Sequence, residues 1–177
     1  MQQQEFIQAV RDAEATLYHV AMSILRNDAD SADAVQEALL KAFEKLDTLK
    51  EKKYFKTWLI RILIHECYQM KRRSKRLVPY EEYVENAPGK EDKLYTDLYA
   101  AIDDLPEDLR IAVTLFYIEG FSIAEIAEML ETRENTVKTR LYRGRNQLRK
   151  FLVIRRKHYV RTGKMERRGT GTFKGIS

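Results

Sequence analysis

The sequence predicts an all-α protein made of two small helical domains joined by a flexible linker. Glycine and proline are scarce, at 7 and 3 of 177 residues, which favours long helices over sheets with tight turns. Apolar residues recur at helical spacing along most of the chain. This recurrence stops over residues 77–93, an acidic stretch with two prolines and a glycine, which we interpret as the linker.

Three helices are predicted before the linker, within a domain covering residues 1–76. The first spans residues 2–26, and the polar run that begins at Asn27 supplies N-cap residues for the second. The expected buried face of the second helix consists of Val35, Leu39, Ala42, Phe43 and Leu46. The third is expected over about residues 54–76, with a buried stripe of Leu59, Ile62, Leu63, Cys67 and Met70.

The second domain is predicted over residues 94–154. A helix should begin near Pro106, because proline is tolerated in the first turn of a helix, and it should end at Gly120. Ser122 and Glu125 form a capping-box pattern that opens a short helix to residue 130. A longer helix is expected from residue 134 to about residue 152, with Gly144 on its apolar stripe for close packing. The basic tail, residues 155–177, is predicted to be disordered.

Several function classes are excluded or disfavoured by composition. Cys67 is the only cysteine, so no intramolecular disulfide is possible, which fits a reducing compartment. No signal peptide or membrane-spanning run is found, and a cytoplasmic location is expected. The histidines are scattered, and no nucleophile–base pair or metal-ligand spacing can be argued. We therefore expect no enzyme activity, no cofactor, no metal and no small-molecule substrate.

Positive charge is concentrated in blocks. The net charge is +5 over residues 71–76 and +7 over residues 155–177, with −7 over residues 77–110 between them. Basic blocks separated in this way suggest a polyanion that is contacted at more than one place. The alternative is a set of solvated helix faces and a charged tail.

A helix–turn–helix is predicted over residues 122–152. The shorter helix would pack through Ile126, Ala127 and Leu130 against Val137 and Leu141 of the longer one. This leaves a basic and polar face that suits phosphates and base edges in a DNA major groove. The alternative is an ordinary helical hairpin with a charged face. The residues on or near that face are Asn135, Thr136, Lys138, Thr139, Tyr142 and Arg143.

Two further surfaces are candidates for binding. Residues 54–76 combine aromatic side chains with a basic run that includes Arg72, a combination that suits opened DNA, although such aromatics are often core residues. On the second predicted helix, three polar residues and one leucine are spaced so that they share one face, which suggests a protein-contact patch. The alternative is an ordinary solvated face. That group is Asp33, Gln36, Glu37 and Leu40.

Together these segments resemble a sigma factor of bacterial RNA polymerase, of the extracytoplasmic-function (ECF) group of the sigma-70 family. Residues 33–43 (DAVQEALLKAF) resemble the polymerase-clamp helix of sigma region 2, and residues 54–62 (YFKTWLIRI) resemble its strand-opening and −10 segment. Residues 105–110 (LPEDLR) resemble the start of region 4. Residues 122–127 (SIAEIA) and 135–143 (NTVKTRLYR) resemble its −35 helix–turn–helix.

The resemblance implies partners and residue roles. Core RNA polymerase would be bound through its largest-subunit clamp and its flap, with the clamp contacted by Asp33, Gln36, Glu37 and Leu40. The −10 element of promoter DNA would be engaged by Tyr54, Phe55, Trp58, Arg61, His65 and Arg72. The −35 element would be read by Asn135, Thr136, Lys138, Thr139, Arg140, Tyr142 and Arg143. Members of this group are often held inactive by an anti-sigma protein, which is a further candidate partner.

This chain departs from the family pattern at several positions. The family often has asparagine at His65, glycine at Glu131, an apolar residue at Thr132 and alanine at Gly144, and the basic tail is unusual. Two rival functions are a stand-alone helix–turn–helix repressor or activator and a nucleic-acid enzyme. The first leaves the surfaces at 33–43 and 54–76 unexplained, and the second lacks clustered acids or metal ligands.

Overall fold

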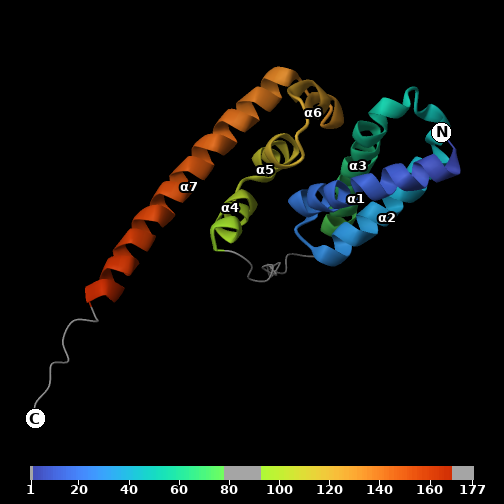
Figure 1. Cartoon of the computed structure of the whole chain (residues 1–177). Coiled ribbons are helices and arrows are strands. Elements are labelled where there is room, and N and C mark those ends of the chain that lie inside the picture. The colour runs from blue at the N-terminus through green and yellow to red at the C-terminus, as the bar shows by residue number, and fades with distance from the viewer. Residues whose placement is uncertain (1, 78–92, 169–177) are drawn as a thin grey trace, which may run out of the picture.

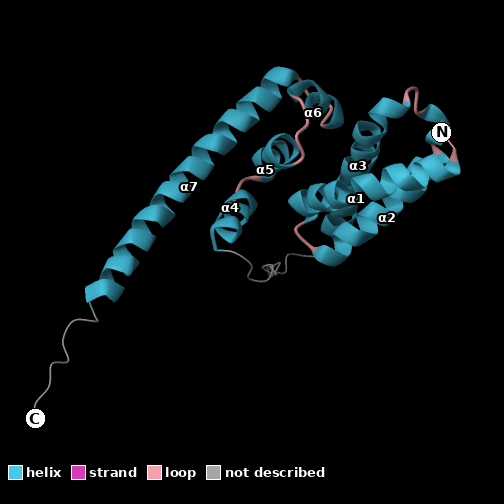
Figure 2. Ribbon diagram, viewed as in Figure 1, coloured by secondary structure: helices cyan, strands magenta, loops and turns pink. Residues whose placement is uncertain are grey.

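The computed structural model describes residues 2–77 and 93–168, and within these ranges every regular element is a helix (Figures 1 and 2). The predicted all-α class is therefore confirmed. The N-terminal group contains α1 (Gln3–Leu25), α2 (Asp28–Glu44) and α3 (Phe55–Leu77), with short 3₁₀ turns at Leu46–Thr48 and Lys52–Tyr54. The C-terminal group contains α4 (Lys93–Asp103), α5 (Glu107–Val113), α6 (Ile123–Met129) and α7 (Glu134–Arg168). A single π-helical turn, η3 (Thr114–Ile118), extends α5.

Local signals explain where the helices begin. The side chain of Asn27 accepts a hydrogen bond from the backbone N–H of Asp30 and so caps α2. Ser122 and Glu125 form the predicted capping box at the start of α6, with each side chain bonded to the other residue's backbone N–H. Gly120 adopts a φ of +75°, which glycine accepts readily, and it ends the helical run of α5 and η3.

The predicted buried face of α2 is displaced from the observed one. The residues buried on α2 are small, namely Ser31, Ala34, Ala38 and Ala42, whereas Phe43 is 53% exposed. Val35 and Leu39 are only partly buried. Small side chains let α2 approach α1 and α3 closely, so the large side chains flank the contact instead of filling it. The prediction was therefore right for Ala42 and wrong for Phe43, and it missed the other small residues that make the contact.

The prediction of a disordered tail from residue 155 is wrong for residues 155–168, which continue α7 to Arg168. Proline is absent from this segment, Gly163 is its only glycine, and Arg, Lys and Met are good helix formers. High charge therefore did not prevent a helix. Residues 169–177 and residues 78–92 of the predicted linker lie outside the described residues.

The two groups of helices pack against each other. Helix α3 contacts α6, and α1 contacts both α5 and η3, so that the helix–turn–helix lies beside the N-terminal helices (Figure 1). One hydrophobic cluster contains fully buried residues from both groups, including Leu17 and Leu59 with Leu115, Ile126 and Val137. A smaller cluster holds α4, α5 and α7 together around Ile102, Leu105, Leu109 and Val113.

Gly144 allows α7 to lie close to α5. A Cβ atom built on this glycine would come within 2.7 Å of Cγ2 of Val113, closer than atoms in van der Waals contact. The residue is buried although it has no side chain. The close packing predicted for this position is therefore what the structure shows, and it fixes the place of α7 relative to α5.

Candidate functional site

The four residues predicted to bind a protein partner lie together on the exposed face of α2. Asp33, Gln36, Glu37 and Leu40 are all exposed, and Leu40 is 64% exposed despite being apolar. Phe43, one turn further on, is also exposed, and its ring packs edge-on against Phe6 at a centroid distance of 5.5 Å. Because Phe43 was assigned to the core, sequence analysis missed it as part of this surface.

Helix α2 is held to α3 beside this face by a buried carboxylate. Lys41 donates a hydrogen bond from Nζ to Oε2 of Glu66 at 2.5 Å and also pairs with Glu37 at 3.2 Å. The hydrogen bond to Glu66 raises the pKa of Lys41 above its ordinary value. Because Lys41 is held between the two carboxylates, it orients Glu37 on the exposed face. The pair formed by Lys41 and Glu66 between α2 and α3 was not predicted from the sequence.

A second face runs along α3. Tyr54, Arg61, His65 and Arg72 are exposed, and Trp58 is partly buried between them. Trp58, Arg61, His65 and Arg72 follow one another at steps of three, four and seven residues, which places them on one side of α3, and Tyr54 lies in the 3₁₀ turn just before this helix. The ring of Tyr54 is 50% exposed, with Nζ of Lys53 at 4.7 Å from its centroid. His65 hydrogen-bonds to the amide of Gln69 at 3.0 Å.

Phe55 does not share that face. It is 5% exposed and packs edge-on against Phe6 at a centroid distance of 5.6 Å, and the ring of Trp58 lies 6.0 Å from its centroid. The structure places Phe55 in the core, which is the alternative interpretation given above for the aromatic residues of this segment. Tyr54 is 50% exposed, and Trp58 is partly buried.

The helix–turn–helix is formed by α6 and α7 as predicted. Ile126, Ala127, Val137 and Leu141 are buried in the shared cluster, and Leu130 packs against it. The exposed side of the first turns of α7 carries Asn135, Lys138, Thr139, Tyr142 and Arg143. Tyr142 is 61% exposed, and the hydroxyl of Thr139 donates to the carbonyl oxygen of Asn135 at 2.8 Å.

Two residues of the predicted recognition face lie at its edge. Thr136 is partly buried, and Arg140 turns toward α5, where its Nε lies 3.6 Å from Oδ2 of Asp108. Arg140 also lies near Tyr68 of α3, whose pKa is raised mainly by burial, with a smaller opposing effect of the Arg140 charge. Only part of the predicted set therefore points outward together.

The turn between α6 and α7 is made by a residue in left-handed backbone geometry. Glu131 has a φ of +49°, the region in which glycine is favoured and in which the resembled family often has glycine. Its carboxylate accepts from the guanidinium of Arg61, with Nη2 to Oε1 at 3.0 Å. The departure noted at this position therefore preserves the turn and adds a contact to α3.

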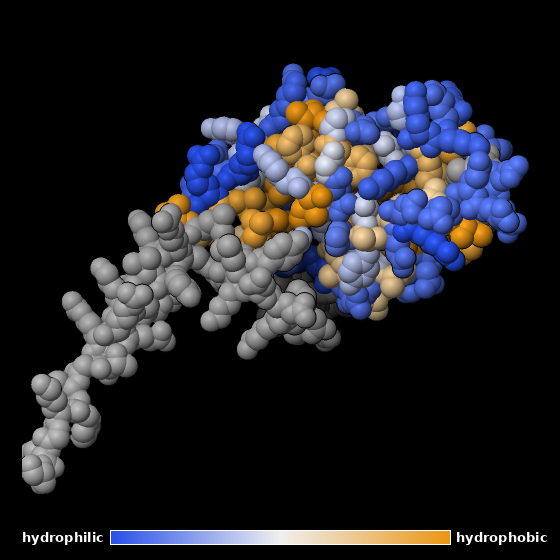
Figure 3. Space-filling view, in the orientation of Figure 1, coloured by the Kyte–Doolittle hydropathy of each residue, from blue (hydrophilic) through white to orange (hydrophobic). Residues whose placement is uncertain are grey.

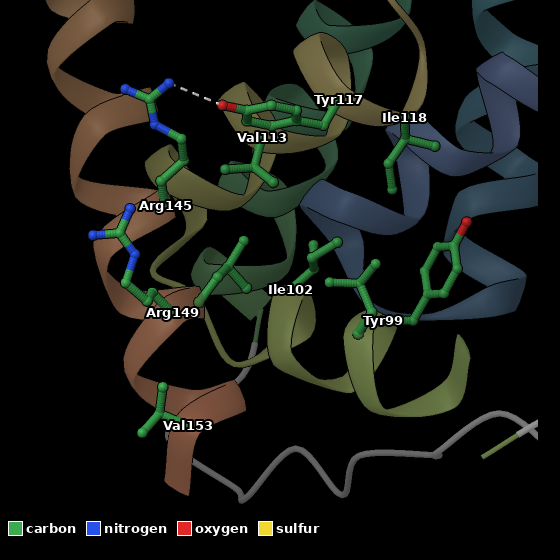
Figure 4. A pocket seen from close by; sticks show the side chains of 10 residues that line it. Tyr99, Ile102, Val113, Tyr117, Ile118, Arg145, Arg149 and Val153 are labelled. Atoms are coloured by element: carbon green, nitrogen blue, oxygen red, sulfur yellow. Dashed lines mark hydrogen bonds between the residues drawn. The ribbon is translucent and has the colours of Figure 1, made fainter. Parts of the chain in front are cut away.

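An apolar groove of about 760 Å³ lies between α4, η3 and α7, on the face where orange surface gathers in Figure 3. Leu98, Tyr117 and Val153 are exposed there, and Arg145 and Arg149 line its α7 side (Figure 4). The guanidinium of Arg145 donates to the hydroxyl of Tyr117 at 3.1 Å, shown dashed in Figure 4. No sequence signal used above pointed to this groove.

The described residues hold no cluster of three His, Cys, Asp or Glu side chains that could bind a metal ion. Cys67 is buried, and burial raises the pKa of its thiol to about 12. Within the same ranges, no helix combines the length and apolar character needed to cross a bilayer.

Comparison with known families and proteins gives consistent matches. Residues 9–77 match the model of sigma-70 region 2, and residues 95–148 match the model of sigma-70 region 4. The RNA polymerase sigma factor SigV of Bacillus subtilis is 34% identical over 146 residues, which is 81% of this chain and 88% of that protein. The ECF sigma factor SigW of the same species is 30% identical over 154 residues, 77% of this chain and 82% of that protein.

A solved structure also matches across both groups of helices. The sigma factor RpoE from Bartonella quintana, crystallised with the anti-sigma factor NepR, has a TM-score of 0.72 and 28% identity. The match covers 85% of this chain and 98% of that one. Since it extends over most of both chains, the likeness includes regions before and after residues 78–92.

Proposed function

The chain belongs to the ECF group of the sigma-70 family, and we propose that one of its exposed helix faces binds core polymerase and that two others bind promoter DNA. Sigma factors of this family act in transcription initiation. The proposed role of this chain is therefore to bind polymerase and promoter, while the polymerase catalyses RNA synthesis. The proposed division is residues 1–76 as region 2, 77–93 as linker, 94–154 as region 4 and 155–177 as a basic extension.

The face of α2 is proposed as the contact with the clamp of the polymerase's largest subunit. Asp33, Gln36 and Glu37 supply acceptors, and Leu40 supplies an exposed apolar group at their side. An apolar side chain within a polar rim is typical of protein interfaces. Phe43 extends this apolar centre, because its ring is exposed and held in place by Phe6.

The face of α3 is proposed to capture the opened −10 element. The exposed ring of Tyr54 and the partly buried Trp58 offer surfaces on which an unstacked base can lie. Arg61 and Arg72 lie further along the same helix, where they can neutralise the phosphate backbone, and His65 lies between them. Opening of the duplex would follow from tighter binding to the unpaired strand, which shifts the population toward the open state.

The face of α7 is proposed to read the −35 element in the major groove. Lys138 and Arg143 can neutralise phosphates or donate to guanine, and Asn135 can bond adenine. Tyr142 and Thr139 are exposed between them. Arg140 is proposed only as a supporting contact, because it is paired with Asp108.

Two partner surfaces complete the proposal. The apolar groove beside Tyr117 is proposed as the binding site of the polymerase flap, because it is a large exposed apolar surface on the described part of the C-terminal group. An anti-sigma protein is proposed as a regulator, supported by the likeness to RpoE of Bartonella quintana in its complex with NepR.

The observation that carries the proposal is the separate exposure of the α2, α3 and α7 faces on one chain. The test is transcription from a promoter library by bacterial core RNA polymerase, with and without the full chain. We expect new start sites only when the chain is present, with permanganate-reactive thymines near −10. Sequence-specific binding to duplex DNA as a dimer, without any stimulation of polymerase, would instead support a stand-alone repressor or activator.

A further inference from the structure

We propose that Glu66, a buried carboxylate on α3, is a positioning residue for polymerase binding, because it fixes Lys41 and thereby orients Glu37 on the α2 face. The inference rests on the proposed function, in which Glu37 contacts the clamp. It goes further because Glu66 belongs to none of the three proposed binding faces and acts only through another side chain.

Glu66 lies on the core side of α3. The residue is 4% exposed, which makes it the least exposed acidic residue in the part of the chain whose burial is described. Leu59 and Leu63, which precede it by seven and three residues and so share its side of the helix, are 0% exposed. A carboxylate in such surroundings is costly unless a cation and hydrogen bonds compensate it. This position therefore requires a cation from a neighbouring element.

Lys41 of α2 supplies that cation and shares it with the exposed face. Its Nζ donates to Oε2 of Glu66 at 2.5 Å and lies 3.2 Å from Oε1 of Glu37. The side chain of Glu66 is 5% exposed, whereas that of Glu37 is 51% exposed. Both carboxylates raise the pKa of Lys41, with the hydrogen bond to Glu66 as the larger cause. Lys41 is therefore anchored to α3, and Glu37 is the partner that solvent or another protein can reach.

Stability alone is a weak reason for this buried pair. Replacing a buried ion pair by apolar residues of similar size is often neutral or stabilising, because both charges must be removed from water. An apolar pair could hold α2 against α3 equally well. It could not attract the carboxylate of Glu37, since only a fixed cation does that.

Orientation of Glu37 should strengthen binding to the clamp. An exposed glutamate samples several rotamers, and a partner that binds one of them restricts the others at a cost in entropy. A Glu37 side chain already held beside Lys41, one helical turn away, loses less freedom when it binds. We therefore expect Glu66 to affect the affinity for polymerase although it is buried.

The main test is an apolar pair, Lys41→Met with Glu66→Leu, in the full chain. We expect its midpoint of urea unfolding to equal or exceed that of the wild type. Its affinity for bacterial core polymerase, measured by fluorescence anisotropy, should fall about threefold, the effect of freeing one long side chain. Unchanged affinity would overturn the positioning role whatever the midpoint, since the pair would then only hold the helices together.

The same apolar pair is then placed in two backgrounds. In a Glu37→Ala chain it should change the affinity no further, because the side chain that it orients has been removed. In an Asp33→Ala chain, which keeps Glu37, the threefold loss should persist. A loss of equal size in both backgrounds would overturn the proposal, because the pair would then act by a route other than Glu37.

Glu66→Gln tests the carboxylate alone and serves if the apolar pair does not fold. It keeps Lys41 and the size of the side chain but removes the charge that strengthens the hydrogen bond. We expect a smaller loss of polymerase affinity in the same direction. The control is Glu5→Gln with Lys52→Met, which removes a 2.7 Å ion pair between α1 and the turn before α3 and should leave the affinity unchanged. Equal affinities for Glu66→Gln and this control would count against the proposal.

The single variant Glu37→Ala separates this inference from the proposed function. If it binds polymerase as the wild type does, the clamp assignment of Glu37 is wrong, and the positioning role is overturned with it. If it binds more weakly while the apolar pair binds normally, only the positioning role is overturned.

Discussion

Gly144 of α7 faces Val113 of α5 so closely that a Cβ atom at position 144 would lie 2.7 Å from Cγ2 of Val113. Gly144→Ala should therefore destabilise the protein by about 1–3 kcal/mol, because the branched valine side chain has little freedom to move aside. The measurement is the free energy of unfolding in urea. Gln147→Ala, on an exposed position of the same helix, is the control and should change it by less than about 0.5 kcal/mol.

If packing against Val113 did not matter, Gly144→Ala would raise the free energy of unfolding instead of lowering it. Alanine is favoured over glycine inside a helix by roughly 0.5–1 kcal/mol. A Gly144→Ala variant that is more stable than the wild type would show that α5 and α7 can adjust without cost.

Glu131 combines an unfavourable backbone conformation with a favourable ion pair. Both Glu131→Gly and Glu131→Ala remove the contact with Arg61, but only glycine accepts a φ of +49° without strain. We expect the glycine variant to be more stable than the alanine variant by about 1 kcal/mol, measured by thermal unfolding. Equal stabilities would indicate that the turn changes its backbone geometry when the carboxylate is removed.

The capping box of α6 should make stability depend on pH. Hydrogen bonds from Ser122 lower the pKa of Glu125 below its ordinary value of 4.5. Because the folded pKa is the lower one, this stabilisation is present above about pH 4.5 and is lost as the pH falls through the folded pKa. Urea unfolding of wild type and Glu125→Gln should therefore differ most near neutral pH and converge in acid. A constant difference across that range would contradict the assignment.

The α2 face should be needed for polymerase binding. Gln36→Ala combined with Glu37→Ala removes two exposed acceptors, and we expect the affinity for core polymerase to fall at least fivefold, corresponding to about 1 kcal/mol. Glu128→Ala with Gln147→Ala removes the same residue types from exposed positions elsewhere. Fluorescence anisotropy measures both. Equal affinities for the two double variants would count against the clamp assignment.

Lys138 should contribute through phosphate neutralisation. Lys138→Ala is expected to weaken duplex binding by the polymerase-bound chain and to reduce the slope of log affinity against log salt by about 1. Lys150→Ala, on an exposed position two turns beyond the proposed face, is the control. An unchanged slope for Lys138→Ala would show that Lys138 does not neutralise a DNA phosphate.

The local structure was predictable because its signals are local. Helical spacing, the N-cap at Asn27, the capping box at Ser122 and the break at Gly120 each act within a few residues, and each is found where it was expected. The residues that share the exposed faces of α2 and α7, which we propose as binding faces, followed from the same periodicity, since a helix fixes which residues share a side.

Tertiary structure decided what depends on contacts between distant segments. It buried Phe55 and left Tyr54 exposed, and it placed the small residues of α2 in the core with Phe43 outside. It also joined Arg61 to Glu131 and Arg110 to Ser23 across the two groups of helices. A repeat of 3.6 residues identifies an apolar face but not its partner, and so the packing of α1 and α3 against α5, η3 and α6 required the folded molecule.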